Sequence, residues 1–132
     1  MKRRFSNRLD YEPIWLSLGI LMIAVVWVLS LIPHPPQIGF ENEDKFAHII
    51  AYGALMLWWS QIVIGLRERV ILAACLIAMG ILIEFVQGWT GWRTFDTHDM
   101  IANAAGVGLG WCLACTPAGS VLARLELGAM RR

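Results

Sequence analysis

Residues 14–32 read IWLSLGILMIAVVWVLSLI, a run of 19 residues without a charged side chain. A helix of this length rises about 28 Å, which matches the apolar thickness of a bilayer. Basic residues precede the run, as they do in a signal peptide, but the run is too long for one and no small-residue cleavage pattern follows it. We therefore expect a retained membrane-spanning helix that ends at the prolines after residue 32.

Three further apolar stretches follow, at residues 46–64, 70–89 and 99–115. Of the 132 residues, 58% are hydrophobic and only 16% are charged, whereas a typical soluble domain is about 25% charged. This composition excludes a disordered chain, and three cysteines do not suit a disulfide-stapled secreted module. We predict one all-α domain over residues 1–132, a polytopic bundle of four transmembrane helices in the lipid bilayer, with a tail at residues 116–132.

The basic residues predict which way the helices cross the membrane. Nine of the eleven precede the first span, connect the second to the third, or follow the fourth, and these three segments share one side. The positive-inside rule therefore places both termini and the tail in the cytoplasm. A net charge of +1 carries no basic surplus, so we expect no nucleic-acid partner. The nine are Lys2, Arg3, Arg4, Arg8, Arg67, Arg69, Arg124, Arg131 and Arg132, and the other two are Lys45 and Arg93.

Polar residues recur at helical spacing near one end of the last three spans. The steps are four residues in the second span, three in the third, and alternately three and four in the last, so each helix carries a polar face. All three faces fall in the outer half of the membrane, and we expect them to enclose a polar pocket open to the extracytoplasmic side. The faces comprise Asp44, His48 and Tyr52, then Glu84 and Gln87, then Asp96, Asp99, Asn103, Gly106 and Gly110.

His48 and Glu84 have two interpretations. A histidine and a carboxylate at one depth suit general acid–base catalysis, because imidazole titrates near neutral pH. In that interpretation Asp96 and Asp99 complete the catalytic set. Alternatively, His48 and Glu84 form a structural hydrogen bond that joins the second and third helices.

Arg93 and Lys45 give the predicted pocket a basic rim. A guanidinium group binds a phosphate or carboxylate through two parallel hydrogen bonds, and a lysine adds a point charge. Alternatively, Arg93 pairs with Asp96 or Asp99 and fixes the loop, while one of these acids caps the fourth helix. The remaining predicted substrate-binding residues are Asp44, Tyr52, Gln87 and Asn103.

Small residues at steps of four in the last span, Ala102, Gly106 and Gly110, predict close helix packing. Two partners stay open for this stripe, another helix of the same chain or a second copy in a homo-oligomer. The cysteines Cys75, Cys112 and Cys115 are interpreted as small apolar packing residues, because a reducing cytoplasmic side does not favour a disulfide.

A metal site can be drawn from the carboxylates and imidazoles at the outer end. The spacing matches no ligand signature such as HExxH, so we predict no metal site, and the sequence leaves the cofactor open. The residues considered are His48, Glu84, Asp96, His98 and Asp99.

Three separate segments resemble the VanZ-like family of small bacterial membrane proteins. They are Asp44-Lys45-x-x-His48-x-x-x-Tyr52, Glu84-x-x-Gln87, and Arg93-x-x-Asp96-x-x-Asp99-x-x-x-Asn103-x-x-Gly106, and the resemblance extends over residues 14–115. It implies a multi-pass protein of the bacterial inner membrane, and the founding member of the family is linked to low-level teicoplanin resistance.

The leading hypothesis is that the pocket binds or processes a polar or anionic molecule of the cell envelope, such as a lipid headgroup or a cell-wall fragment. The alternative is a structural or regulatory membrane protein whose polar residues only stabilise the bundle. Whether the protein is an enzyme stays open. Below Tyr52 and Asn103 no charged residue continues the polar face inward, which argues against a through-path for ions within one chain.

Overall fold

The computed structural model describes residues 9–35 and 37–130, and these residues form helices and connections without a strand. The elements are α1 (Glu12–Leu31), α2 (Glu43–Ile62), α3 (Leu66–Thr90), α4 (Thr97–Ala114), the short 3₁₀ helix η1 (Pro117–Ser120) and α5 (Val121–Ala129). Outside the described residues lie Lys2, Arg3, Arg4, Arg8, Pro36, Arg131 and Arg132, six of which contribute to the predicted orientation. The all-α prediction is confirmed for the described part of the chain.

Helix ends follow local chemistry rather than hydropathy alone. α2 and α4 begin two to three residues before the predicted apolar stretches, because polar residues such as Glu43 and Asp96 suit a helix N-terminus. Asn42 precedes α2 at φ 60° and Gly91 ends α3 at φ 77°, two left-handed positions that these residue types tolerate. The backbone therefore turns sharply just before α2 and just after α3.

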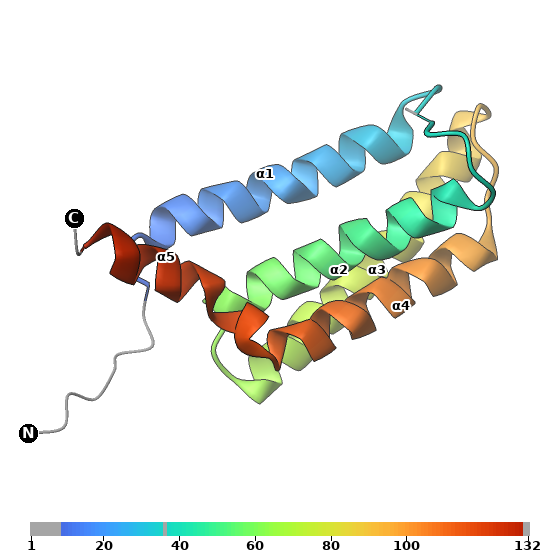
Figure 1. The fold of residues 1–132 in the computed structure, drawn as a ribbon. Coiled ribbons are helices and arrows are strands. Elements are labelled where there is room, and N and C mark those ends of the chain that lie inside the picture. The colour runs from blue at the N-terminus through green and yellow to red at the C-terminus, as the bar shows by residue number, and fades with distance from the viewer. Residues whose placement is uncertain (1–8, 36, 131–132) are drawn as a thin grey trace, which may run out of the picture.

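α2 and α4 form the closest helix pair of the bundle, and α3 lies beside them while α1 packs more loosely (Figure 1). A Cβ added to Gly106 would meet the Ile49 carbonyl oxygen at 2.5 Å, and one added to Gly110 would clash with the Gly53 carbonyl oxygen. Because only glycine fits this contact, the stripe packs within the chain. This result decides between the two partners that the sequence leaves open for it.

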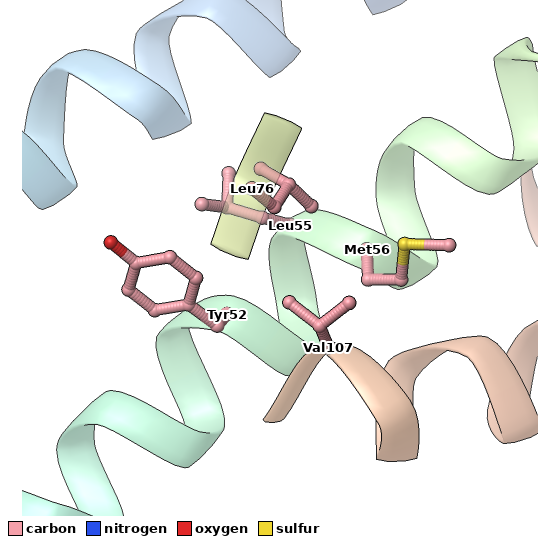
Figure 2. Packing of buried hydrophobic residues seen from close by; sticks show 5 residues of the cluster. All are labelled: Tyr52, Leu55, Met56, Leu76 and Val107. Carbon is pink, nitrogen blue, oxygen red and sulfur yellow. The ribbon is translucent and has the colours of Figure 1, made fainter. Parts of the chain in front are cut away.

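The apolar core lies between α2, α3 and α4. Figure 2 shows five of its side chains, with the Tyr52 hydroxyl directed away from Met56 and Val107. Leu55 and Met56 are fully buried, and Leu76 reaches the cluster from α3. The ring of Tyr52 therefore belongs to the core while its hydroxyl lies at the edge of the cluster.

α1 and α3 are each long and apolar enough to cross a membrane. α4 meets this condition only together with residues 117–129, across a bend of 72°. α2 does not meet it, because Lys45, His48 and Gln61 lower its hydropathy. Length and composition thus support two spanning helices, or three if the bent pair counts as one.

The tail packs against the first helix. The Glu126 carboxylate of α5 accepts the Tyr11 backbone N–H at 2.9 Å, the Asp10 N–H at 2.8 Å and the Trp15 indole N–H at 2.6 Å. It thereby holds the two residues that lead into α1, whose N-cap residue Tyr11 makes no side-chain cap hydrogen bond. The tail contains the short helix α5, which Figure 1 shows beside the start of α1.

Candidate functional site

The connection from α1 to α2 and that from α3 to α4 lie at the same end of the bundle (Figure 1). Polar side chains of α2, α3 and α4 meet there. His48 is the centre of this cluster and is 8% exposed. Its Nδ1 lies 2.8 Å from Asn103 Oδ1, and its Nε2 lies 3.5 Å from Asp99 Oδ2. His48 therefore links α2 to α4 through both ring nitrogens.

Lys45 lies one turn before His48 and bridges two acids of the α4 start. Its Nζ is 3.1 Å from Asp96 Oδ2 and 3.2 Å from Asp99 Oδ1. Asp96 also accepts the His98 backbone N–H at 2.8 Å, so it is the N-cap of α4. The hydrogen bonds from the His98 backbone, from the His98 ring and from Lys45 lower the pKa of Asp96 to about 2. The predicted acidic cap of the fourth helix is confirmed.

Glu84 is fully buried in α3 and faces the start of α4. Its Oε2 accepts the Asp96 backbone N–H at 3.1 Å, while its Oε1 has no hydrogen-bond partner among the described residues. No hydrogen bond joins Glu84 to His48 in this part of the chain, so the predicted structural bond between the second and third helices is wrong. The reason is that the start of α4 supplies the partners of both side chains: Asn103 and Asp99 for His48, and the Asp96 backbone N–H for Glu84.

Arg93 pairs with Asp44 across the two connections, at 3.7 Å between Nη2 and Oδ1. The predicted alternative, in which Arg93 pairs with Asp96 or Asp99, is therefore wrong, because Lys45 already occupies both carboxylates. The side chain of Arg93 is 14% exposed and that of Asp44 is 55% exposed. This pair forms the outer rim of the cluster.

Gln87 lies apart from the cavity described below. Its Nε2 donates to the Ser30 carbonyl oxygen at 2.7 Å, and the Trp92 indole N–H donates to the Leu31 carbonyl oxygen at 3.1 Å. These two bonds satisfy carbonyl groups of the last turn of α1. The structure thus places Gln87 as a residue that holds α1 against α3.

A cavity of about 630 Å³ opens between the end of α1, the connection after it and the first half of α2. Its wall combines apolar side chains with four predicted site residues, and the buried Tyr52 hydroxyl has no partner within the described residues. The lining residues include Val26, Leu29, Ala51, Asp44, His48, Tyr52 and Arg93. Lys45, Glu84, Gln87, Asp96, Asp99 and Asn103 do not line it.

Comparison with protein families places this geometry in a known context. A family model described as VanZ/LLP1 matches residues 18–118, which is most of the chain. The chain belongs to the VanZ/LLP1 family. The match includes the whole polar cluster and every helix except the start of α1 and the tail. Together with its apolar helices, this membership makes it a membrane protein. No curated protein and no solved structure matches the chain.

Several residues that shape this VanZ/LLP1 site escape sequence reasoning. Gly53 of α2 meets the α4 stripe, and Gly80 of α3 lies against Asn103, whose Nδ2 a Cβ there would approach to 2.7 Å. Single glycines in apolar helices are common in membrane proteins, so neither glycine gave a sequence signal. Ser30 contributes through a backbone carbonyl, which leaves no sequence signal.

The cysteines are placed differently from the prediction. All three are free and exposed on the surface of the chain, so they do not pack in its interior. The faces of α3 and α4 that point into the bundle carry other residues, among them the buried Gly80 and Gly110. The three are Cys75, Cys112 and Cys115.

Proposed function

We propose that this protein is a multi-pass protein of the bacterial inner membrane in which α1 to α4 all cross the bilayer and both termini lie in the cytoplasm. The packing of α2 supports the proposal. The polar residues that lower its hydropathy, His48 and Lys45, face α4 rather than the surroundings of the bundle. A helix with such a face can cross a membrane when its neighbours cover the polar groups.

Reporter fusions test this topology. Green fluorescent protein fused after residue 132 should fluoresce, since it folds in the cytoplasm, and alkaline phosphatase inserted after Gln37 should be active, since it needs the periplasm. If phosphatase is inactive after Gln37 but active when it is fused after residue 132 instead, the orientation is the opposite of the proposed one.

We propose further that the cavity binds a polar or anionic molecule derived from the cell envelope. One observation carries this proposal: the buried Tyr52 hydroxyl, unpaired within the described chain, belongs to a cavity wall that also contains Arg93. A buried polar group without a partner costs about 1–3 kcal/mol, which a bound polar ligand would recover. The apolar wall from Val26, Leu29 and Ala51 suits the chain of an amphiphile, and Arg93 suits its anionic group.

Native mass spectrometry can test the ligand class with phosphatidylglycerol as the probe and phosphatidylcholine as the neutral comparison. We expect phosphatidylglycerol to be retained preferentially. Arg93→Ala should weaken retention about tenfold or more, because a hydrogen bond to a charged group contributes about 1.5–3 kcal/mol. The matched control Arg124→Ala removes an exposed arginine of α5 and should bind like the wild type. Equal retention by both variants would contradict the proposal.

The second candidate is a structural or regulatory membrane protein without a ligand. The observation in its favour is that Lys45, Asp96 and Asp99 already satisfy one another. His48→Ala, which changes a residue of the cavity wall, separates the two candidates. In the binding hypothesis retention of the probe falls while membrane levels stay normal, and in the structural hypothesis any loss follows the loss of folded protein in detergent.

The link of the founding member to teicoplanin suggests a cellular readout. We propose that expression of this protein raises the minimal inhibitory concentration of teicoplanin in a susceptible host, and that Arg93→Ala abolishes the increase at equal membrane levels. An unchanged concentration on expression of the wild type would remove resistance from the proposed function.

A further inference from the structure

We propose that Asp44, His48 and Asp99 form a binding site for a divalent transition-metal ion of the Zn²⁺ or Mn²⁺ type beside the cavity. One ligand atom from each of the three side chains lies within 4.8 Å of the others. The sequence does not single out this trio, because it assigns Asp44 to the substrate and Asp99 lies 55 residues after Asp44 along the chain. The inference goes beyond the proposed ligand and holds or fails independently of it.

The hydrogen bonds of His48 prepare it as a ligand. Asn103 presents its Oδ1 to Nδ1 at 2.8 Å, and a carbonyl oxygen only accepts, so Nδ1 carries the proton and donates it. The lone pair of the neutral ring then lies on Nε2, which faces Asp99 Oδ2 at 3.5 Å. Metal-bound histidines commonly donate their other ring N–H to such an oxygen, which fixes tautomer and orientation. His48 therefore meets a carboxylate with a lone pair, an arrangement that needs a cation or a second proton between them.

The two carboxylates each have an oxygen left for a cation. Lys45 pairs with Asp99 Oδ1 and leaves Oδ2 on the His48 side. Arg93 lies 3.7 Å from Asp44 Oδ1, a long pair on a side chain that is more than half exposed. The three aspartates of the cluster exceed Lys45 and Arg93 by one negative charge before Glu84 is counted. A divalent cation would remove this excess.

The ligand set decides the class of metal. Carboxylates alone suit Mg²⁺ or Ca²⁺, whereas an imidazole among them favours first-row transition metals. Asp44 and His48 both line the cavity. Three protein ligands at the edge of a cavity leave coordination positions for water or for an anionic ligand, as in catalytic rather than structural metal sites.

Isothermal titration calorimetry with ZnCl₂ alone tests the site on the full chain in detergent, purified with a tag that contains no histidine. We expect saturable binding of one Zn²⁺ per chain that a tenfold excess of Mg²⁺ does not displace. Asp44→Asn should weaken the affinity at least tenfold, and because Asp44 is exposed this variant should stay folded. His48→Ala should weaken it at least as much. The matched controls His34→Ala and Glu41→Gln change exposed residues outside the trio and should bind like the wild type.

Three results would overturn the metal site. Absence of saturable Zn²⁺ binding in the wild type removes the metal site. An Asp44→Asn affinity equal to that of the wild type, or displacement by Mg²⁺, means that Zn²⁺ binds elsewhere or to the acids without selectivity. If His48→Ala elutes as aggregate in size-exclusion chromatography, Asp44→Asn decides the question alone. Zn²⁺ binding without retention of phosphatidylglycerol would reject the proposed ligand and keep the metal site.

Discussion

Asp96 links three helices with one side chain and one backbone group. Its carboxylate caps α4 and pairs with Lys45 of α2, and its backbone N–H donates to Glu84 of α3. The capping role is readable from the sequence because the acid stands just before a helical pattern. The two long-range bonds were not predictable, since Lys45 and Glu84 could each have met several other polar groups at the same depth.

The lowered pKa of Asp96 predicts how stability depends on acidity. Since the folded pKa of about 2 lies below the ordinary value of 3.8 for an aspartate, the contribution of Asp96 to stability is complete above about pH 4 and is lost as the pH falls through 2. Thermal unfolding of the wild type in detergent between pH 5 and 2 should show this loss. Asp96→Asn keeps a good N-cap and removes the charge, so its unfolding temperature should depend less on pH over this range. An identical pH dependence would contradict the assignment.

At the scale of elements, the contact of α2 with α4 positions the site. Gly53, Gly106 and Gly110 bring the two backbones together, and this approach sets His48 opposite Asn103 and Asp99. The stripe on α4 was visible in the sequence as a small residue at every fourth position. Its partner was not, because a glycine stripe fits any helix that offers a small residue at the matching height.

Gly106→Ala should therefore destabilise the bundle. Its Cβ would meet the Ile49 carbonyl oxygen at 2.5 Å, and backbone cannot move aside cheaply. We expect a loss of about 1–3 kcal/mol in the free energy of unfolding, the usual cost of overpacking. Gly108→Ala on the same helix is the matched control, because nothing lies within 4 Å of its added Cβ. It should be neutral or stabilising through helix propensity. Equal unfolding temperatures for the two variants would contradict this packing.

At the scale of the whole molecule, the tail contacts the start of the first helix at the end of the bundle opposite the polar cluster. α5 carries Glu126 to the start of α1, where burial of the carboxylate is compensated by three donors. Gln61 of α2 accepts the Leu122 backbone N–H at 3.0 Å, so the tail is also attached to the bundle. α1, which packs loosely elsewhere, is thus held by Glu126 at one end and by Gln87 at the other.

Glu126→Gln should loosen this attachment. The amide offers one acceptor oxygen in place of two and carries no charge, so at least one part-buried donor loses its hydrogen bond, which contributes about 1 kcal/mol. We expect a lower unfolding temperature and faster proteolysis after Arg124 in detergent. Glu41→Gln, an exposed acid before α2, is the control. Unchanged proteolysis and stability of Glu126→Gln would show that α5 is held by its apolar face alone.

The sequence alone determined the helical class, the number and approximate position of the long helices, the polar ends of three of them and the family. These follow from local periodicity and composition, which each segment carries by itself. Only the tertiary structure decided which polar groups meet. His48 contacts Asn103 and Asp99 instead of Glu84, and Lys45 pairs with the two acids that were alternatives for Arg93. Gln87 of α3 binds a carbonyl group of α1. Pairings depend on the rotation and depth of helices relative to one another, and these are set by backbone contacts such as that of Gly106 with Ile49.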